Sequence, residues 1–274
     1  MKKIIVPSDF TSVADAAIHY AIQINKVLQY QIVLLNIAKD DEDVAAANEK
    51  LDAQVAKFKS SSNVDLQAMV RVGNIFDHIP QVAKEENAEL VVMGTHGLRG
   101  LMQFIVGGNA LRIINDSAMP IIITQSDTQT EKISKVLVPL DLHKETKQTL
   151  TVAKDVAARF NAEVHIVSPD EKDEFLRNRI VRNIHYAEGY LEEHGLKYKT
   201  TMLESGIGFT KEVIKYAKYN GIDLICILNT SDEQLIHAFG IDSEQKMITN
   251  DADIPVMVIN GVTTLLDSRT IFAQ

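Results

Sequence analysis

Short, continuous runs of Val, Ile and Leu alternate along the chain with longer segments of helical periodicity. In the first half, the apolar runs predict strands at residues 4–6, 31–37, 66–72, 89–94 and 120–124. The segments between them predict helices from residue 12, over about 43–58 and 76–86, and from about 108. Continuous apolar runs are typical of parallel strands covered by helices on both faces. The pattern therefore predicts an alternating, doubly wound α/β fold.

Two local features indicate where helices begin. Ser12 is the predicted N-cap of the first helix, with Asp15 three residues further on. Pro80 has no N–H to donate, and a proline is tolerated in the first turn of a helix. We therefore expect the helix that contains Pro80 to begin near Asp77.

The chain contains an internal repeat. The segment IIVPSD at 4–9 recurs as VLVPLD at 136–141, 132 residues later, and two further apolar runs recur at offsets of 134 and 135 residues in the same order. The stretch 126–132 is polar and lacks apolar periodicity, which suits a linker with a boundary near Thr130. We predict two doubly wound five-stranded parallel-sheet domains of the Rossmann-like kind. Their ranges are 1–130 and 131–261, followed by a C-terminal tail at 262–274 without a counterpart in the first copy.

The residues that follow the first and fourth strands are the candidates for chemistry, because open parallel sheets bind ligands beyond the carboxyl ends of their strands. Pro7, Ser8 and Asp9 follow the first strand, and the fourth strand leads into the glycine-dense stretch at 94–109. Glycines let backbone N–H groups approach an anion closely, and a helix beginning near Gly108 would present its free N–H groups to a phosphate. Asp9 would then face a ribose hydroxyl or a divalent ion.

Composition and charge narrow the class of ligand. Lys and Arg total 28 against 37 Asp and Glu, which gives a formal net charge of −9 and disfavours nucleic acid and anionic lipid surfaces. The single cysteine excludes an internal disulfide framework and a Cys-clustered metal site. We expect a cytoplasmic protein, because the N-terminus reaches Pro7 before an export signal could form. We expect no membrane segment, because no apolar run approaches the ~20 residues needed to span a bilayer.

At this point the sequence resembles the universal stress protein family. Its nucleotide-binding members carry Gly, two residues, Gly, nine residues, Gly and then Ser or Thr, and Gly94, Gly97 and Gly107 have this spacing. The resemblance covers both copies, including the Val-Pro-x-Asp segment after each first strand, and implies a tandem form of the family. Gly108 stands where the motif has Ser or Thr, which removes one hydroxyl donor and is expected to weaken affinity without removing the pocket.

The resemblance also implies a set of ligand contacts. Pro7, Ser8 and Asp9 would flank an adenosine, with the backbone of Ile37 at the adenine edge. Around the ribose and phosphates it implies a wall made by Met93, Gly94, His96 and Gly97. The backbone N–H groups that would hold the phosphates are those of Gly107, Gly108, Asn109 and Ala110. The implied ligand is ATP, AMP or ADP, with Mg²⁺ as a candidate companion.

Each of these residues also has a purely structural interpretation. The glycine cluster could be a turn with close helix packing, and Asp9 could be a turn or helix-entry carboxylate. His96 is expected to line a ligand without acid–base duty, because no carboxylate or nucleophile is positioned by sequence to pair with it. The second copy has no glycine at either motif position and carries Asp232 and Glu233 there, so we expect it not to bind nucleotide.

Three classes of function compete. We favour a regulatory protein of the universal stress type that binds an adenine nucleotide in its first domain without dedicated turnover. The alternative is a stress-related interaction or scaffold protein with a vestigial pocket, which the departure at Gly108 keeps open. The third class is an enzyme: an adenylating relative is disfavoured because the loop after the first strand lacks a Ser-Gly-Gly type sequence, while slow ATP hydrolysis stays open. We expect a homodimer or an intramolecular domain pair, without a metal site.

Overall fold

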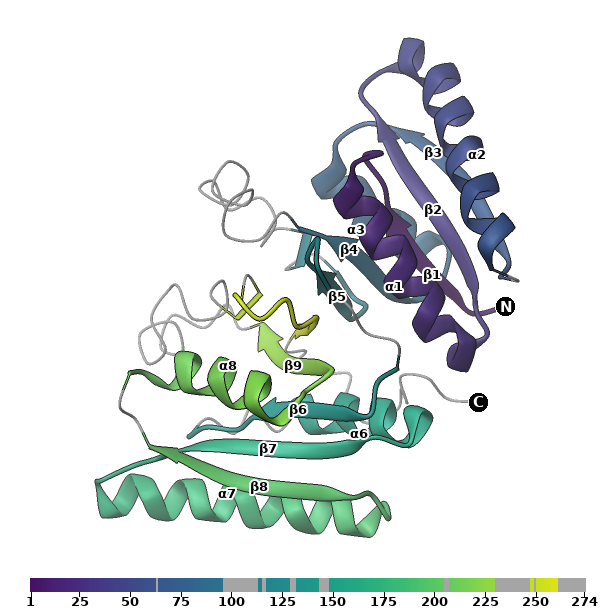
Figure 1. Cartoon of the computed structure of the whole chain (residues 1–274). Helices are drawn as coiled ribbons and strands as arrows, with labels where there is room; N and C mark the ends of the chain where they lie inside the picture. The colour runs from purple at the N-terminus through teal and green to yellow at the C-terminus, as the bar shows by residue number, and fades with distance from the viewer. Residues whose placement is uncertain are drawn as a thin grey trace. The chain divides into compact units, whose positions relative to one another are not determined.

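The computed structural model describes residues 1–62, 64–95, 113–114, 117–128, 132–142, 148–204, 207–229, 247–248 and 250–260. The chain separates into two compact units, Met1–Glu131 and Lys132–Gln274 (Figure 1). Most of the helix expected from about residue 108, and the tail at 262–274, lie outside the described residues.

Strands and helices alternate along the first unit (Figure 1). Its strands are β1 (Lys3–Pro7), β2 (Gln31–Ala38), β3 (Leu66–Val72), β4 (Ala88–Gly94) and β5 (Ile121–Thr124). Its helices are α1 (Ser12–Leu28), the short 3-10 helix η1 (Asp41–Asp43), α2 (Val44–Ser61) and α3 (Ile75–Glu85). Each strand predicted in this half of the chain is present, with ends shifted by no more than one residue.

The strands of the first unit form a parallel sheet in the order β3-β2-β1-β4-β5. The chain steps from β1 to β2 to β3 in one direction and then returns across the sheet to β4 on the other side of β1. Since parallel crossovers are right-handed, α1 and α2 cover one face of the sheet and α3 covers the opposite face. This is the predicted doubly wound α/β fold, and its strand order reverses between β1 and β4.

Helix α1 buries an apolar stripe on the sheet, as the periodicity predicts. Val13, Ala17, Tyr20 and Ile24 are all buried, and α1 packs on β1 and β4. The predicted N-cap at Ser12 is wrong, because Thr11 has the extended backbone of a cap and its side chain accepts a hydrogen bond from the N–H of Ala14.

The expected start of the third helix near Asp77 is also wrong. Helix α3 begins at Ile75, and its N-cap Asn74 accepts a hydrogen bond from the N–H of Phe76. Pro80 therefore lies inside the helix rather than in its first turn. The helix gives up one backbone hydrogen bond there, while Pro80 and its neighbour Ile79 are both buried.

The second unit repeats this architecture. Its strands are β6 (Lys135–Pro139), β7 (Glu163–Asp170), β8 (Tyr198–Glu204), β9 (Leu224–Asn229) and β10 (Val256–Asn260). Its described helices are α6 (Gln148–Phe160), α7 (Glu174–Glu193) and α8 (Phe209–Asn220). The strands are parallel in the order β10-β9-β6-β7-β8, so the reversal of strand order falls between β6 and β9.

A buried polar cluster distinguishes the core of the second unit. His165 on β7 is 2% exposed, and its Nδ1 lies 2.9 Å from the hydroxyl of Tyr216 on α8. Its Nε2 lies 3.3 Å from a carboxylate oxygen of Glu163. In the first unit the residue 132 positions earlier is Val33, which is fully buried. The two cores thus share a fold while differing in chemistry.

This cluster predicts a pH-dependent stability for the second unit. Burial lowers the pKa of His165 below its ordinary value of 6.5 and outweighs the opposing effect of Glu163, while Lys135 and Lys199 lower the pKa further. The unfolded chain then binds the proton more readily than the native one, so the free energy of unfolding falls as the pH drops below 6.5.

We expect His165→Val to flatten that dependence in denaturant unfolding followed by circular dichroism between about pH 5 and pH 8. The exposed His185 on α7 supplies the control, since His185→Gln should leave the dependence as it is in the wild type. An unchanged pH profile in His165→Val would show that burial of this histidine is not its source.

Candidate functional site

The two central strands of the first unit separate at their carboxyl ends. The pairing of β1 with β4 stops at Ile5 and Val91. Beyond that point β1 stays paired with β2 through Pro7, and β4 stays paired with β5 through Gly94. A crevice therefore opens between the ends of β1 and β4, at the reversal of strand order where doubly wound sheets bind ligands.

The backbone of Ile37 faces this crevice. In β2 the N–H of Ile32 donates to Asp65 on the β3 side, while the carbonyl of Leu35 accepts from the N–H of Ser8 on the β1 side. Because hydrogen-bonding direction alternates along a strand, Ile37 directs its N–H and carbonyl to the β1 side. The last paired residue of β1 is Pro7, so these groups reach past the end of that strand.

Gly94 closes the crevice from the β4 side. The N–H groups of Val91 and Thr95 donate toward β5, so the intervening Gly94 directs its backbone groups toward β1. A Cβ at Gly94 would lie 2.5 Å from the carbonyl oxygen of Val13 and 2.7 Å from its Cγ1. Only glycine fits between the end of β4 and the first turn of α1.

The loop after β1 is a tight turn with an exposed carboxylate. Phe10 has a φ of 66°, a left-handed conformation that costs free energy in a residue with a side chain. Asp9 Oδ1 accepts hydrogen bonds from the N–H and the hydroxyl of Thr11, at 3.1 and 2.6 Å. Among the described residues Asp9 Oδ2 has no partner, so this oxygen is available to the hydroxyls of a ligand.

Ser8 is tied to the scaffold by a chain of hydrogen bonds. Its hydroxyl donates to Gln54 Oε1 on α2 at 2.8 Å, and Gln54 Nε2 donates to Asp15 Oδ1 at 2.6 Å. Lys57 pairs with the other oxygen of Asp15 at 2.6 Å, and Asn36 Nδ2 donates to the backbone carbonyl of Ser8 at 2.8 Å. The Ser8 side chain is therefore directed at α2, and its backbone N–H and carbonyl are both engaged by β2, so the neighbouring Asp9 is the polar side chain that this loop exposes.

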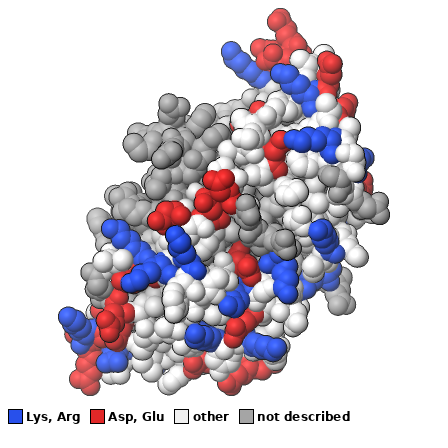
Figure 2. Space-filling view, in the orientation of Figure 1, with Lys and Arg blue, Asp and Glu red and all other residues white. Residues whose placement is uncertain are grey.

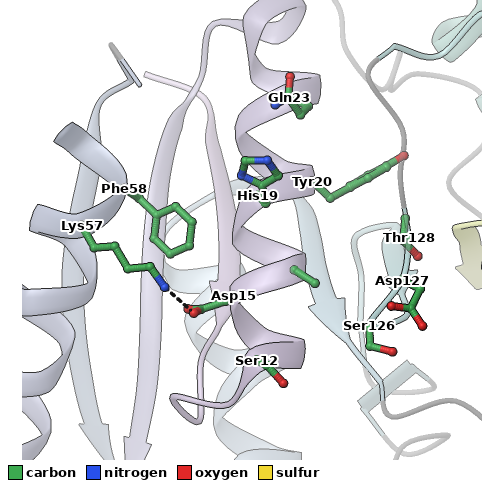
Figure 3. Close-up of a pocket in the computed structure, with 11 residues that line it drawn as sticks. Ser12, Asp15, His19, Tyr20, Gln23, Lys57, Phe58, Ser126, Asp127 and Thr128 are labelled. Atoms are coloured by element: carbon green, nitrogen blue, oxygen red, sulfur yellow. Dashed lines mark hydrogen bonds and ion pairs between the residues drawn. The ribbon is translucent and has the colours of Figure 1, made fainter. Parts of the chain in front are cut away.

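A separate cavity of about 560 Å³ lies beside α1 (Figure 3). Figure 3 shows the ion pair of Asp15 and Lys57 on one side of α1 and the segment 126–128 on the other. None of the predicted ligand contacts within the described residues lines this cavity. Its connection to the crevice is the chain through Asp15 and Gln54 to Ser8.

Half of the predicted contacts can be placed. The sheet brings Pro7, Ser8, Asp9, Ile37, Met93 and Gly94 to one edge of the first unit. The other predicted contacts lie outside the described residues, and these are His96, Gly97, Gly107, Gly108, Asn109 and Ala110.

Sequence reasoning missed the residues that position the loop after β1. Asn36 carried a readable signal, because it is a polar residue inside the apolar run of β2. Gln54 carried none, since nothing in a polar helix face indicates a hydrogen bond to a residue 46 positions away.

The corresponding edge of the second unit is built differently. The pairing of β6 with β9 likewise stops at Leu137, but Asp141 is only 3% exposed whereas Asp9 is exposed. On α7, Asn183 Nδ2 donates to the carbonyl of Asp141 at 2.8 Å and Arg179 donates to the carbonyl of Leu142 at 3.1 Å. Side chains of α7 thus occupy the backbone acceptors of this loop.

Other kinds of site find no support in the described part of the chain. No group of three or more His, Cys, Asp or Glu side chains there could hold a metal ion, and none of its helices has the length and apolarity to cross a bilayer. Cys226 is fully buried, and burial raises its pKa to about 12, so it is a core residue rather than a nucleophile. On the face shown in Figure 2, basic and acidic side chains are interspersed.

Strand order, crevice and backbone geometry together define a Rossmann-like α/β protein with its candidate site at the switch point of the first unit. Residues 1–125 match the model of the universal stress protein family. A universal stress protein of Methanocaldococcus jannaschii is 25% identical over 139 residues, which cover 45% of this chain and 82% of that protein.

Two solved structures match the chain, one over most of its length and one over about half of it. The crystal structure of a universal stress protein from Archaeoglobus fulgidus covers 95% of this chain and 97% of its own, at 17% identity and a TM-score of 0.75. A universal stress protein from Arabidopsis thaliana, solved with AMP bound, covers 48% of this chain and 98% of its own, at 18% identity and a TM-score of 0.35. Residues 1–125 thus match the universal stress protein family, and the chain shares its fold over nearly its whole length with the Archaeoglobus fulgidus protein.

Proposed function

We propose that the chain is a regulatory protein that binds an adenine nucleotide in the crevice of its first unit, without dedicated turnover. The observation that carries the proposal is the pair of backbone edges, Ile37 on one side and Gly94 on the other, that face the gap between β1 and β4. A planar base with donor and acceptor atoms on its edge can pair with the N–H and carbonyl of Ile37.

Asp9 suits the sugar of such a ligand. Its Oδ2 is available to accept a hydrogen bond. In dinucleotide-binding sheets a carboxylate oxygen accepts hydrogen bonds from ribose hydroxyls in this way. The turn at Phe10 places Asp9 beyond the end of β1, on the exposed side of the loop. The phosphates would meet the glycine-rich segment 94–108, whose spacing matches the nucleotide-binding motif of the family.

The second unit is proposed as a non-binding partner domain. The loop after β6 has its backbone carbonyls engaged by Arg179 and Asn183, and Asp141 is buried. Carboxylates at 232–233 would oppose a phosphate. We therefore expect one ligand per chain. We also expect the protein to act in the cytoplasm.

Isothermal titration of the nucleotide-stripped full-length protein with ATP and Mg²⁺, and separately with AMP, tests the proposal. We expect one site per chain with a dissociation constant in the micromolar range, about −8 kcal/mol of binding free energy. Asp9→Ala should weaken binding about tenfold or more through loss of a charge-assisted hydrogen bond, and Gly97→Val should weaken it by obstructing the approach of phosphate.

Asp173→Ala is the matched control, because Asp173, like Asp9, accepts a hydrogen bond from a backbone N–H near the start of a helix, but lies in the second unit. It should leave the affinity unchanged. No heat and no thermal shift with ATP, ADP or AMP would reject the nucleotide site and favour the scaffold function that the departure at Gly108 keeps open.

A further inference from the structure

Thr95, the residue directly after β4, has a buried hydroxyl that the fold does not use. Its side chain is 6% exposed, and its hydroxyl oxygen has no hydrogen-bond partner within the described part of the chain. Its backbone N–H is engaged, donating to the carbonyl of Thr124 at 2.8 Å. A buried hydroxyl without a partner costs free energy, so a residue of this kind in a binding edge points to a partner supplied from outside.

Thr95 lies directly after β4, at the edge of the sheet where the crevice is found. Gly94 directs its Cβ position at Val13 of α1, and side chains alternate between the faces of a strand. The Thr95 side chain therefore points to the face of the sheet opposite α1, on the same side as Met93. At the carboxyl end of β4, Gly94 thus presents a backbone edge and Thr95 presents a hydroxyl.

The neighbouring Thr124 serves as a comparison, because its hydroxyl has a hydrogen-bond partner. Thr124 is fully buried at the end of β5, and its hydroxyl donates a long hydrogen bond of 3.5 Å to the carbonyl of Met93. Both threonines are more than nine-tenths buried, Thr124 at the end of β5 and Thr95 directly after the adjacent β4. Only the hydroxyl of Thr95 lacks a protein partner within the described residues.

We propose that the Thr95 hydroxyl is a specificity contact of the nucleotide site, completing its hydrogen bonding on the ribose or phosphate of the bound ligand. This inference rests on the proposed function. A hydroxyl both donates and accepts, so it can serve a phosphate oxygen or a ribose hydroxyl, and it cannot reach the adenine edge that faces Ile37 on the far side of β1.

Substitutions at Thr95 can separate an effect on ligand affinity from an effect on the stability of the fold. In the full-length, nucleotide-stripped protein, Thr95→Val should lower the affinity for AMP about tenfold, while Thr95→Ser, which keeps the hydroxyl, should stay within about threefold of the wild type. The ligand-free Thr95→Val protein should be as stable as the wild type or melt a few degrees higher, because a methyl replaces an unsatisfied hydroxyl. A hydroxyl that holds the fold together would give the opposite stability result.

Thr124→Val is the matched control and should leave the affinity for AMP within about twofold of the wild type. Titration with adenosine locates the contact: a loss for AMP alone supports a phosphate partner, and a loss for both ligands supports the ribose. Equal affinity of Thr95→Val and wild type overturns this inference alone, as does a lower melting temperature of the ligand-free variant. Failure of the wild type to bind overturns the proposed function itself.

Discussion

Replacing Gly94 by valine is expected to destabilise the first unit by about 3 kcal/mol and to abolish ligand binding with it. The clash is with backbone, since the added Cβ would lie 2.5 Å from the carbonyl oxygen of Val13. A backbone carbonyl in the first turn of a helix cannot rotate aside as a flexible side chain can. The end of β4 or the start of α1 must therefore move, and the backbone edge that Gly94 presents to the crevice is disturbed.

Denaturant unfolding of Gly94→Val and Gly94→Ala against the wild type measures this effect, and alanine should cost about 2 kcal/mol. Gly189→Ala is the matched control. Gly189 lies inside α7, towards its C-terminal end, with nothing within 4 Å of its Cβ position, so alanine there should stabilise the helix by about 0.5–1 kcal/mol. Wild-type stability in Gly94→Val would contradict the close approach of α1 to β4.

Asn250→Ala is expected to destabilise the second unit by about 3 kcal/mol. The Asn250 side chain is 1% exposed and organises the turn before β10. Its Nδ2 donates to the carbonyls of Met247 and Ile254, and its Oδ1 accepts from the N–H groups of Ala252 and Ile254. Alanine would leave these backbone groups without their partner in a buried turn, where unsatisfied groups are costly.

The same unfolding measurement checks this prediction, with Asn48→Ala as control. Asn48 is exposed on α2 and makes a single hydrogen bond to the carbonyl of Val44. Its replacement should change the free energy of unfolding by no more than about 0.5 kcal/mol. A loss of less than about 1 kcal/mol in Asn250→Ala would mean that the turn is held by other contacts.

The strands were predictable from the sequence because their burial on both faces imposes continuous apolar runs, such as 89–94. The ends of the helices were less predictable from the sequence. Thr11 and Ser12 can both cap a helix, and the choice depends on the left-handed turn at Phe10, which no local pattern indicates. The position of Pro80 is decided by burial of the α3 face, which outweighs one lost hydrogen bond.

The sequence predicted at which edge of the sheet the candidate site lies. It did not predict the hydrogen bonds between side chains that position the site. The carboxyl ends of parallel strands lie at one edge of a sheet, so Asp9 and Gly94 could be expected at the same edge. The bond from Ser8 to Gln54 depends on how α2 packs. The unused hydroxyl of Thr95 depends on the absence of a partner, which only the packed structure reveals.

The crevice between β1 and β4 is bordered largely by main chain, at Ile37 and at Gly94. Recognition of this kind survives extensive drift in side-chain identity, because the fold itself carries the recognising atoms. Most alanine substitutions at the surface of the site would therefore be expected to leave the affinity for a ligand unchanged. Substitutions that alter the backbone, such as added bulk at glycine or a proline that deletes one N–H in β2, would be the informative library.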